Sequence, residues 1–198
     1  DLQIPAVGIS GVDAGLIRAH KRPPVEGKDG ESVDYGFVGD IDSVEADILQ
    51  KQLDNGLMPV VSPLSCDESG TLLNINADTV AAAIAAELDA EKLILVTGAT
   101  GILEDVHDPA SLISYIDRRH LRELKEKGIL ADGMLPKAAA IDAAIKDGVS
   151  RVHVISYKLP DSILLEVFTN EGTGTLVVDD IAALTPEELT PEDEGSGT

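Results

Sequence analysis

The sequence predicts an α/β fold: a three-layer αβα sandwich built around a mainly parallel sheet. Short apolar runs alternate with amphipathic or Ala-rich segments along most of the 198 residues. The run "KLILVT" (92–97) is an almost continuous series of Leu and β-branched residues, as expected of a strand covered on both faces. The spacing between successive strand-like runs leaves room for a helix between them. Together these observations predict helices packed on both faces of the sheet.

The first half of the chain contains strands, hairpins and two helices in this interpretation. "IPAVGIS" (4–10) predicts a buried strand, and the Gly-, Asp- and Pro-rich residues 11–43 predict hairpins. "SVEADILQKQLDNG" (43–56) predicts an amphipathic helix that ends at Gly56. Two short strands, "MPVVSPL" and "TLLNIN", flank the turn "CDESG", and residues 78–89 predict a buried helix because they are apolar almost all round.

The second half begins with "KLILVT", which we expect to be a central strand of the sheet. Further strands are predicted at "RVHVIS" and "GTLVV", with helices near 118–127, 137–147 and 160–169. The stretch "LTPEELTPEDEGSGT" is acidic and almost without apolar residues. It predicts a disordered tail, which we place at residues 180–198.

The charge of the chain narrows the classes of function. Thirty-six acidic residues against 15 Lys and Arg give a formal net charge of −21. Such a charge repels nucleic acids and anionic membranes, so neither is an expected partner. No apolar run approaches the length of a membrane span, and the single Cys66 excludes an internal disulfide and a Cys-cluster metal site. We therefore expect a cytoplasmic protein.

A glycine-containing turn follows the strand in "LILVTGATGIL" and raises the question of dinucleotide binding. The third glycine of a dehydrogenase pattern would fall at Glu104, and no Tyr-x-x-x-Lys pair follows. A partial glycine pattern is weak evidence, and we reject the dehydrogenase interpretation. A ligand-binding role remains consistent with a loop at the carboxyl end of a strand.

A lysine stands at an unusual place in "ADGMLPKAAAIDAAIKDG". Pro136 suits the first helical turn, and Asp132 with Gly133 suits the preceding turn. Lys137 then lies where the helix dipole disfavours a cation, unless an anion such as phosphate binds at the same place. A solvated lysine that tolerates a few tenths of a kcal/mol of unfavourable electrostatics is the alternative.

Polar residues also join a strand to a helix in "TLLNINADTVAAAIAAEL" (71–88), where Asn74, Asn76 and Asp78 lie between two apolar segments. Asn and Asp commonly cap helices, because they accept hydrogen bonds from the unpaired amides of the first turn. A ligand site is the alternative, because strand-to-helix junctions are where open α/β sheets bind ligands.

The ordered set "GTLLNINADT", "EKLILVTGATGIL", "GILADGMLPK" and "LLEVFTNEGTGTLV" closely resembles the acetylglutamate kinases of the amino acid kinase family. "IPAVGISGVDAGLIRA" and "GFVGDI" fit the same pattern, so the resemblance covers residues 1 to about 178. It implies an amino acid kinase-like fold and ATP-dependent phosphorylation of the side-chain carboxylate of N-acetyl-L-glutamate, in arginine biosynthesis. The nucleotide would carry Mg²⁺.

The resemblance also implies roles for individual residues. Asn74 would bind the acyl amino acid, Asp78 would organise the catalytic lysines, and Lys137 would stabilise the transferring phosphoryl group. The nucleotide-binding residues would be Gly98, Ala99, Thr100, Gly101, Ile102 and Leu103, together with Leu130, Ala131 and Asp132. It further implies a remnant of an acyl-amino-acid-binding lobe at residues 1–56 and a nucleotide-binding lobe at 57–179.

Several family elements are not found in this sequence. They are the lysine of "K-x-G-G", the "G-G-G" phosphate loop and the substrate-binding Arg, so we expect the amino-terminal lobe to be incomplete and the chain alone to be a poor kinase. Gly98 stands where the family usually carries Asp, and Asp161 where it often has His. Glu166 and Gly172 belong to a segment that resembles the arginine-binding segment of feedback-inhibited members; helix packing and a tight turn are the alternative there.

Other functions stay open at this point. The chain could be a non-catalytic descendant that binds nucleotide or amino acid, or a kinase for carrier-bound aminoadipate or glutamate, although an acidic carrier suits a chain of charge −21 poorly. We expect a homo-oligomer. The four histidines, at 20, 107, 120 and 153, lack metal-ligand spacing, so no protein-bound metal is expected.

Overall fold

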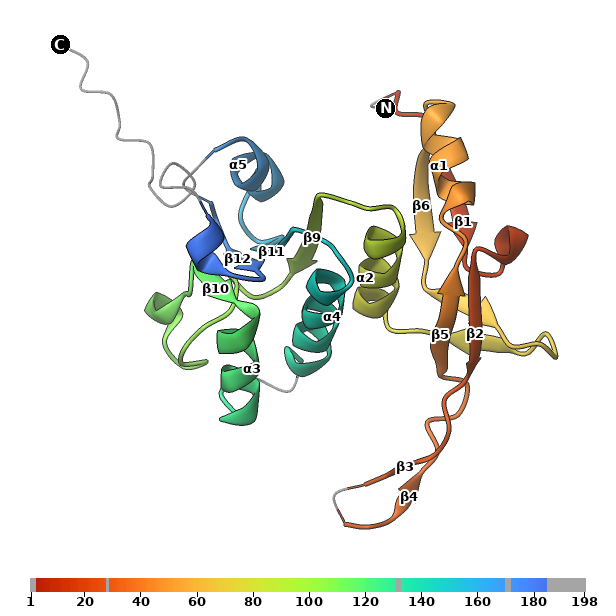
Figure 1. Cartoon of the computed structure of the whole chain (residues 1–198), viewed down its shortest axis with the longest axis horizontal. Coiled ribbons are helices and arrows are strands. Elements are labelled where there is room, and N and C mark those ends of the chain that lie inside the picture. Colours follow the sequence, from red (N-terminus) through yellow and green to blue (C-terminus); the bar gives the residue numbers. More distant parts are fainter. Residues whose placement is uncertain (1–2, 28, 131–132, 170–171, 185–198) are drawn as a thin grey trace. The chain divides into compact units, whose positions relative to one another are not determined.

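A computed structural model describes residues 3–27, 29–130, 133–169 and 172–184. The chain divides into two compact units, Asp1–Leu88 and Asp89–Thr198, which are called here the first and second units. Figure 1 labels most of their helices and strands, and each unit is described by itself.

The first unit contains a two-stranded sheet, a four-stranded sheet and a hairpin. In the two-stranded sheet, β1 (Ala6–Ser10) pairs in parallel with β6 (Met58–Ser62), with Ala6 opposite Met58. The four-stranded sheet has the order β5-β2-β7-β8. Its strands are β2 (Ile17–Lys21), β5 (Gly39–Val44), β7 (Leu64–Cys66) and β8 (Leu72–Asn74), and the antiparallel hairpin is β3 (Val25–Glu26) with β4 (Ser32–Val33).

Two helices complete the first unit, as the hydrophobic patterns predict. α1 (Asp47–Asp54) buries Leu49 and is followed by Gly56, whose φ of 73° suits a residue without a side chain after a helix end. α2 (Ala77–Glu87) buries Val80, Ala82 and Ala85. A short 3₁₀ helix, η1 (Asp13–Gly15), follows β1. The core is a cluster of buried residues from the four-stranded sheet, the η1–β2 turn, the β8–α2 connection and both helices: Leu16, Ile17, Ala19, Val44, Leu49, Leu73, Ile75 and Val80.

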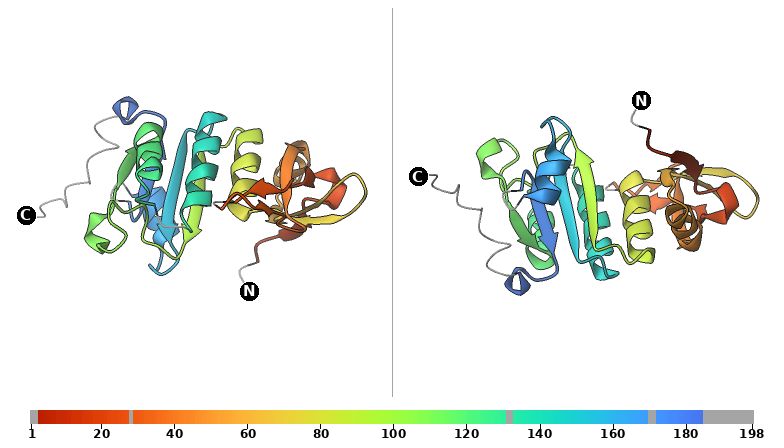
Figure 2. Two further views of the ribbon diagram at one scale, coloured as in Figure 1. Left: turned by 90° about the horizontal axis from the view of Figure 1, so that it is seen from below. Right: turned by 90° about the horizontal axis from the view of Figure 1, so that it is seen from above.

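The second unit is a four-stranded sheet of order β10-β12-β11-β9 with three α-helices. β9 and β11 are parallel, β10 and β12 are parallel, and β11 and β12 are antiparallel. Helices α3 and α4 pack together, and α4 and α5 both contact β11; Figure 2 shows the same unit from two further sides. The elements are β9 (Lys92–Thr97), β10 (Tyr115–Asp117), α3 (Arg118–Glu126), α4 (Leu135–Lys146), β11 (Arg151–Ser156), α5 (Ser162–Phe168) and β12 (Thr175–Val178), with 3₁₀ helices η2 (Pro109–Ser111) and η3 (Ile181–Ala183).

The predicted α/β class and most predicted elements are confirmed, with two corrections. β9 is an edge strand rather than a central one, and Val152–Ser156 of β11 form the strand that is buried along its length. β1 is a strand, but its residues are exposed or half-buried, so the prediction of a buried strand is wrong. Both errors have the same cause, because an apolar run reports that a segment avoids water and not which strands lie beside it.

The predicted division into functional lobes between residues 56 and 57 stays a prediction. Along the chain, the boundary between the two compact units falls between Leu88 and Asp89. Of the predicted tail, residues 185–198 lie outside the described part of the chain. Within the described part, none of the helices has the length and apolar character that crossing a membrane demands.

Candidate functional site

The three polar residues of the strand-to-helix junction before α2, Asn74, Asn76 and Asp78, have different environments. Asn76 is the cap: its side-chain oxygen accepts a hydrogen bond from the amide of Thr79 at 3.1 Å. Asp78 lies in the first turn of α2 and is half-buried. The backbone amide of Asn74 donates to the carbonyl oxygen of Phe37 at 2.8 Å, while its side chain is exposed.

The exposure of Asn74 follows from strand alternation. Leu73 and Ile75 are buried in the core of the first unit, so Asn74 between them must face the other way. Helix capping therefore explains Asn76. The side-chain amide of Asn74, in contrast, is exposed and can be reached by a ligand.

The predicted nucleotide loop, Gly98–Leu103, leaves the carboxyl end of β9 and is held at its far end by β12. The amide of Ile102 donates to Oγ1 of Thr175 at 2.8 Å, and the carbonyl oxygen of Ile102 accepts from the amide of Ile113 at 2.9 Å. A Cβ at Gly101 would lie 2.6 Å from both Leu112 and Thr175, so only glycine fits there. The loop is thus a closely packed structure at the sheet edge where α/β folds bind ligands.

Sequence reasoning missed two residues that contact this loop. Thr175 is buried and lies 73 residues from Ile102 along the chain, and its position in a "GTGT" run gave no sign of the contact. Tyr157 follows β11, and a Cβ at Gly98 would lie 3.2 Å from its hydroxyl oxygen. An aromatic residue directly after the predicted strand "RVHVIS" was the signal that could have found Tyr157.

The start of α4 carries a buried cation. Lys137 lies in the first turn, next to Pro136, and only 8% of its surface is exposed. The helix has no acidic residue in that turn and no side-chain hydrogen bond at Met134, its N-cap residue. Burial rules out the alternative of a solvated lysine. Of the turn before α4, Leu130 is buried, whereas Ala131 and Asp132 lie outside the described residues.

A cavity of about 210 Å³ lies in the second unit near β11 and α5. His153 and Glu166 form part of its wall, and Nδ1 of His153 lies 2.7 Å from Oε1 of Glu166. The other carboxylate oxygen accepts from the amide of Thr173 at 2.6 Å. Ser114, Gly172 and Gly174 also line the cavity, with Lys92, Tyr115, Arg151, Val167, Thr169 and Leu176.

The electrostatics of this cavity are set by Glu166. Burial alone raises the pKa of Glu166, but the hydrogen bonds from His153 and Thr173 outweigh it and hold the pKa below its ordinary value of 4.5. The carboxylate is therefore ionised at neutral pH, which requires Nδ1 of His153 to donate. Nε2 of His153 is buried without a hydrogen-bond partner among the described residues.

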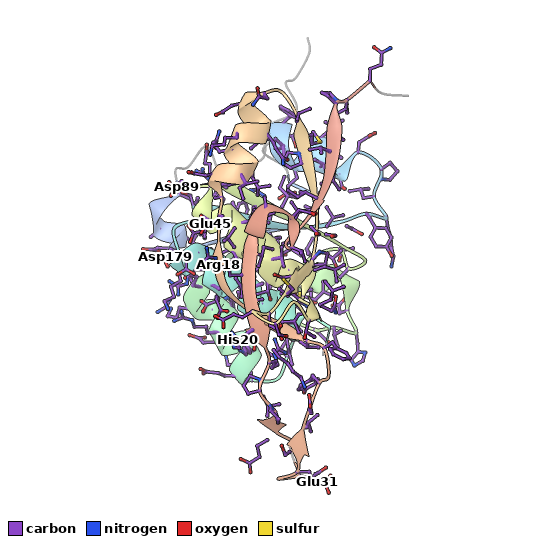
Figure 3. All side chains as sticks on the ribbon, turned by 90° about the vertical axis from the view of Figure 1, so that its right-hand side faces the viewer. Arg18, His20, Glu31, Glu45, Asp89 and Asp179 are labelled. Carbon is purple, nitrogen blue, oxygen red and sulfur yellow. The ribbon has the colours of Figure 1, made fainter. Side chains whose placement is uncertain are left out.

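The first unit has a broader pocket of about 600 Å³ between β2, β5 and the turn after β7. Arg18 on β2 lines it together with Asp42 and Asp67, and Nδ1 of the neighbouring His20 lies 2.7 Å from Asp42. Figure 3 shows Arg18 and His20 on the same strand. Neither pocket holds a group of three or more His, Cys, Asp or Glu side chains suited to a metal ion, and no such group occurs elsewhere in the described part of the chain.

Comparison with known proteins supplies a family. Residues 2–156 match the amino acid kinase family. The acetylglutamate kinase of Myxococcus xanthus is 47% identical over 186 residues, which cover 90% of this chain and 60% of that protein. The acetylglutamate kinase of Symbiobacterium thermophilum is 45% identical over 175 residues, with 88% and 60% covered.

Solved structures agree on the fold. N-acetylglutamate synthase from Neisseria gonorrhoeae, complexed with coenzyme A and L-arginine, superposes with a TM-score of 0.76 and 25% identity, covering 89% of this chain and 38% of that one. The chain spans about 60% of the length of the curated relatives it matches.

Proposed function

This chain belongs to the amino acid kinase family, and from that premise we propose that it takes part in ATP-dependent phosphorylation of the side-chain carboxylate of N-acetyl-L-glutamate. The observation that carries the proposal is the buried Lys137 in the first turn of α4, a helix start without an acidic residue. A cation held there is most stable when an anion binds beside it. A phosphoryl group in transfer is such an anion.

The chemistry agrees with the residues present. Transfer of a phosphoryl group to a carboxylate needs no protein nucleophile; it needs in-line positioning and positive charge or amide donors around the moving group. In this proposal Lys137 stabilises the charge that develops on the phosphoryl group, and Asp78 orients the catalytic lysines. Asn74 donates hydrogen bonds to acetylglutamate from its exposed amide.

ATP would bind along the loop Gly98–Leu103 and the turn that includes Leu130, Ala131 and Asp132, bringing Mg²⁺ with it. The close packing at Gly101 supports this assignment, because it brings the backbone of a glycine-containing turn to the carboxyl end of a strand, where α/β folds bind ligands. An enzyme that draws on the ATP pool for arginine biosynthesis would act in the cytoplasm.

Two measurements test the proposal. Isothermal titration with ADP·Mg²⁺ at millimolar concentration should give saturable heat, and a folded chain without heat would contradict the nucleotide site. Turnover is measured as acetylglutamate-dependent ADP release, both in this chain and in a joined protein that adds to it the part of the Myxococcus xanthus relative outside the match. We expect turnover in the joined protein and little in the chain alone.

Turnover on free acetylglutamate separates the proposal from both alternatives. A non-catalytic descendant would bind nucleotide or amino acid, and the joined protein would show no turnover. A kinase for carrier-bound aminoadipate or glutamate would be inactive on free acetylglutamate. We favour the free substrate because the formal charge of −21 opposes an acidic carrier protein.

A second function, binding of an amino-acid effector such as arginine, is favoured by the cavity beside Glu166. The ionised carboxylate of Glu166 suits a cationic group, while Lys92 and Arg151 on the same wall suit a carboxylate. The Neisseria gonorrhoeae synthase, whose structure contains L-arginine, supports an effector of this class. Arginine should raise the melting temperature of the wild-type chain and leave that of Glu166→Gln unchanged; equal shifts in both would contradict the cavity as the site.

We also propose that the protein forms a homo-oligomer. β1 and β6 form a two-stranded sheet, and no further strand among the described residues pairs with either edge. Met58 and Val60 on β6 are exposed, and unpaired edges with apolar side chains favour pairing with another chain. Size-exclusion chromatography with light scattering should give a mass above 20.8 kDa; a stable monomer would exclude the oligomer.

A further inference from the structure

Tyr157 occupies the space that a side chain at Gly98 would need. A Cβ built on Gly98 would lie 3.2 Å from the tyrosine hydroxyl oxygen, 3.4 Å from Cε1 and 3.6 Å from Cζ. The hydroxyl end of the ring, rather than its base, therefore lies over the backbone of Gly98. This residue opens the loop that we propose to bind the nucleotide.

The backbone holds the ring in this place. β9 and β11 run in parallel with Thr97 opposite Ser156, so Gly98 and Tyr157 are the first residues beyond two neighbouring strands. The amide of Tyr157 donates to the carbonyl oxygen of Thr97 at 3.0 Å, which continues the ladder beyond β11. Tyr157 is thus fixed at the carboxyl edge of the sheet, where α/β folds bind ligands.

Packing does not explain the ring. Tyr157 is 67% exposed, whereas the preceding residues Val152–Ser156 are all buried. A large aromatic side chain that covers a glycine of a loop and otherwise faces water contributes little to a core. It does present a hydrogen-bond donor and a flat apolar surface to whatever binds the loop.

We propose that Tyr157 is a nucleotide-binding residue of this chain, whose hydroxyl group donates a hydrogen bond to a phosphate oxygen of the nucleotide bound at Gly98–Leu103. This inference rests on the proposed function. It adds Tyr157 to the residues that we propose to contact the nucleotide, because its ring lies against Gly98. A neutral donor suits a polyanion in a chain of formal charge −21, because it adds no repulsion. Lys158, which is exposed beside it, adds a positive charge to the same edge.

Titration with ADP·Mg²⁺ compares the wild-type chain with Tyr157→Phe and Tyr157→Ala. Tyr157→Phe keeps the ring and loses only the hydroxyl group, so we expect the dissociation constant to rise about 3- to 10-fold, the range for one hydrogen bond. Tyr157→Ala should weaken binding at least as much. The matched control is Phe168→Ala, which removes a 78% exposed aromatic ring from α5 and should leave the affinity within about twofold.

A double-mutant cycle tests whether the contact between the Tyr157 ring and Gly98 affects nucleotide binding. In the wild-type background, Gly98→Ala presses on the tyrosine hydroxyl group and should weaken ADP binding. The three atoms nearest to the added Cβ all belong to Tyr157, so in the Tyr157→Ala background the same substitution should have a smaller effect, and the two changes should be coupled. Additive effects would place the ring outside the site.

Each outcome decides the matter. If the wild-type chain binds ADP·Mg²⁺ and both tyrosine variants bind equally well, the inference is wrong while the proposed function stands. If Tyr157→Phe binds like the wild type and only Tyr157→Ala is weaker, the ring packs on the loop and the hydrogen bond is refuted. If Tyr157→Ala fails to fold, as judged by its melting curve, Tyr157→Phe alone decides. A folded wild-type chain that binds no ADP overturns both the proposed function and this inference.

Discussion

The starts of α2 and α4 follow opposite electrostatic rules. At α2, Asn76 caps the helix with a side-chain hydrogen bond and the acidic Asp78 lies in the first turn, as the helix dipole favours. At α4, Met134 provides no side-chain cap, the first turn has no acidic residue, and Lys137 is buried there. α2 therefore begins in the way that stabilises a helix, whereas α4 begins with a buried lysine that the helix dipole disfavours.

The difference teaches which kind of polar residue signals function. A capping residue explains itself within its own helix, so Asn76 needs no ligand. A cation in the first turn of a helix is unfavourable toward the helix dipole, and for this reason Lys137 is the residue at which we propose an anionic ligand. The following predictions test this distinction, in order of expected effect.

Lys137 carries the largest predicted effect. In the joined protein, Lys137→Met keeps the packing of the side-chain stem and removes its charge, so kcat should fall about 100-fold or more, equivalent to about 3 kcal/mol of transition-state stabilisation. Lys146→Met, in the last turn of the same helix, is the control and should leave kcat nearly unchanged. If kcat fell by less than about threefold in Lys137→Met, Lys137 would have no catalytic role and the start of α4 would differ from that of α2 in electrostatics alone.

Glu166 is a second buried charged residue, and its hydrogen bonds to His153 and Thr173 lie within its own unit. Its folded pKa is lowered by His153 and Thr173, so the carboxylate stabilises the fold fully above the ordinary pKa of 4.5. That stabilisation is lost as the pH falls below 4.5 through the folded pKa. At pH 7, Glu166→Gln should therefore lower the free energy of unfolding by about 2 kcal/mol.

Urea unfolding at pH 7, 4 and 3 measures this effect, and the difference between wild type and Glu166→Gln should shrink toward pH 3. The control is Glu123→Gln on α3, which removes an exposed ion pair in which Glu123 lies 3.8 Å from Lys127. This change should alter the free energy of unfolding by less than about 0.5 kcal/mol. A difference that is constant with pH would mean that the charge of Glu166 contributes nothing.

Asn74 and Asn76 separate binding from capping at α2. Asn74→Ala in the joined protein should raise the KM for acetylglutamate about 10-fold, since it removes hydrogen bonds worth about 1.4 kcal/mol. The exposed side chain of Asn74 contributes little to the core, so the unfolding midpoint should stay unchanged. An unaltered KM would remove Asn74 from the substrate site.

Asn76→Ala has the smallest predicted effect and the opposite profile. It removes the hydrogen bond to the amide of Thr79, so the free energy of unfolding should fall by about 1 kcal/mol while KM stays as in the parent. Urea unfolding and steady-state kinetics on the same preparation measure both quantities. If Asn76→Ala raised KM as much as Asn74→Ala, the distinction between cap and ligand residue at this junction would fail.

Local patterns in the sequence predicted the α/β class, the α-helices, most strands of the second unit other than β10, and the place of Lys137 in the first turn of α4. These features depend on hydrophobic periodicity and helix-end signals within about ten residues, which are readable from one chain. The family resemblance supplied the site residues, whose roles remain predictions, and Ala131 and Asp132 lie outside the described part of the chain.

Only the tertiary structure decided which segments lie beside each other. "KLILVT" is apolar enough for a central strand, yet β9 lies at the sheet edge, because strand order depends on pairings that no single strand encodes. The contact of Ile102 with Thr175 and the position of Tyr157 over Gly98 join residues that are 73 and 59 positions apart. Such contacts arise when separate strands end at one edge of a sheet. The sequence by itself therefore determined the α-helices and most strands. Their packing decided which side chains surround the proposed nucleotide loop.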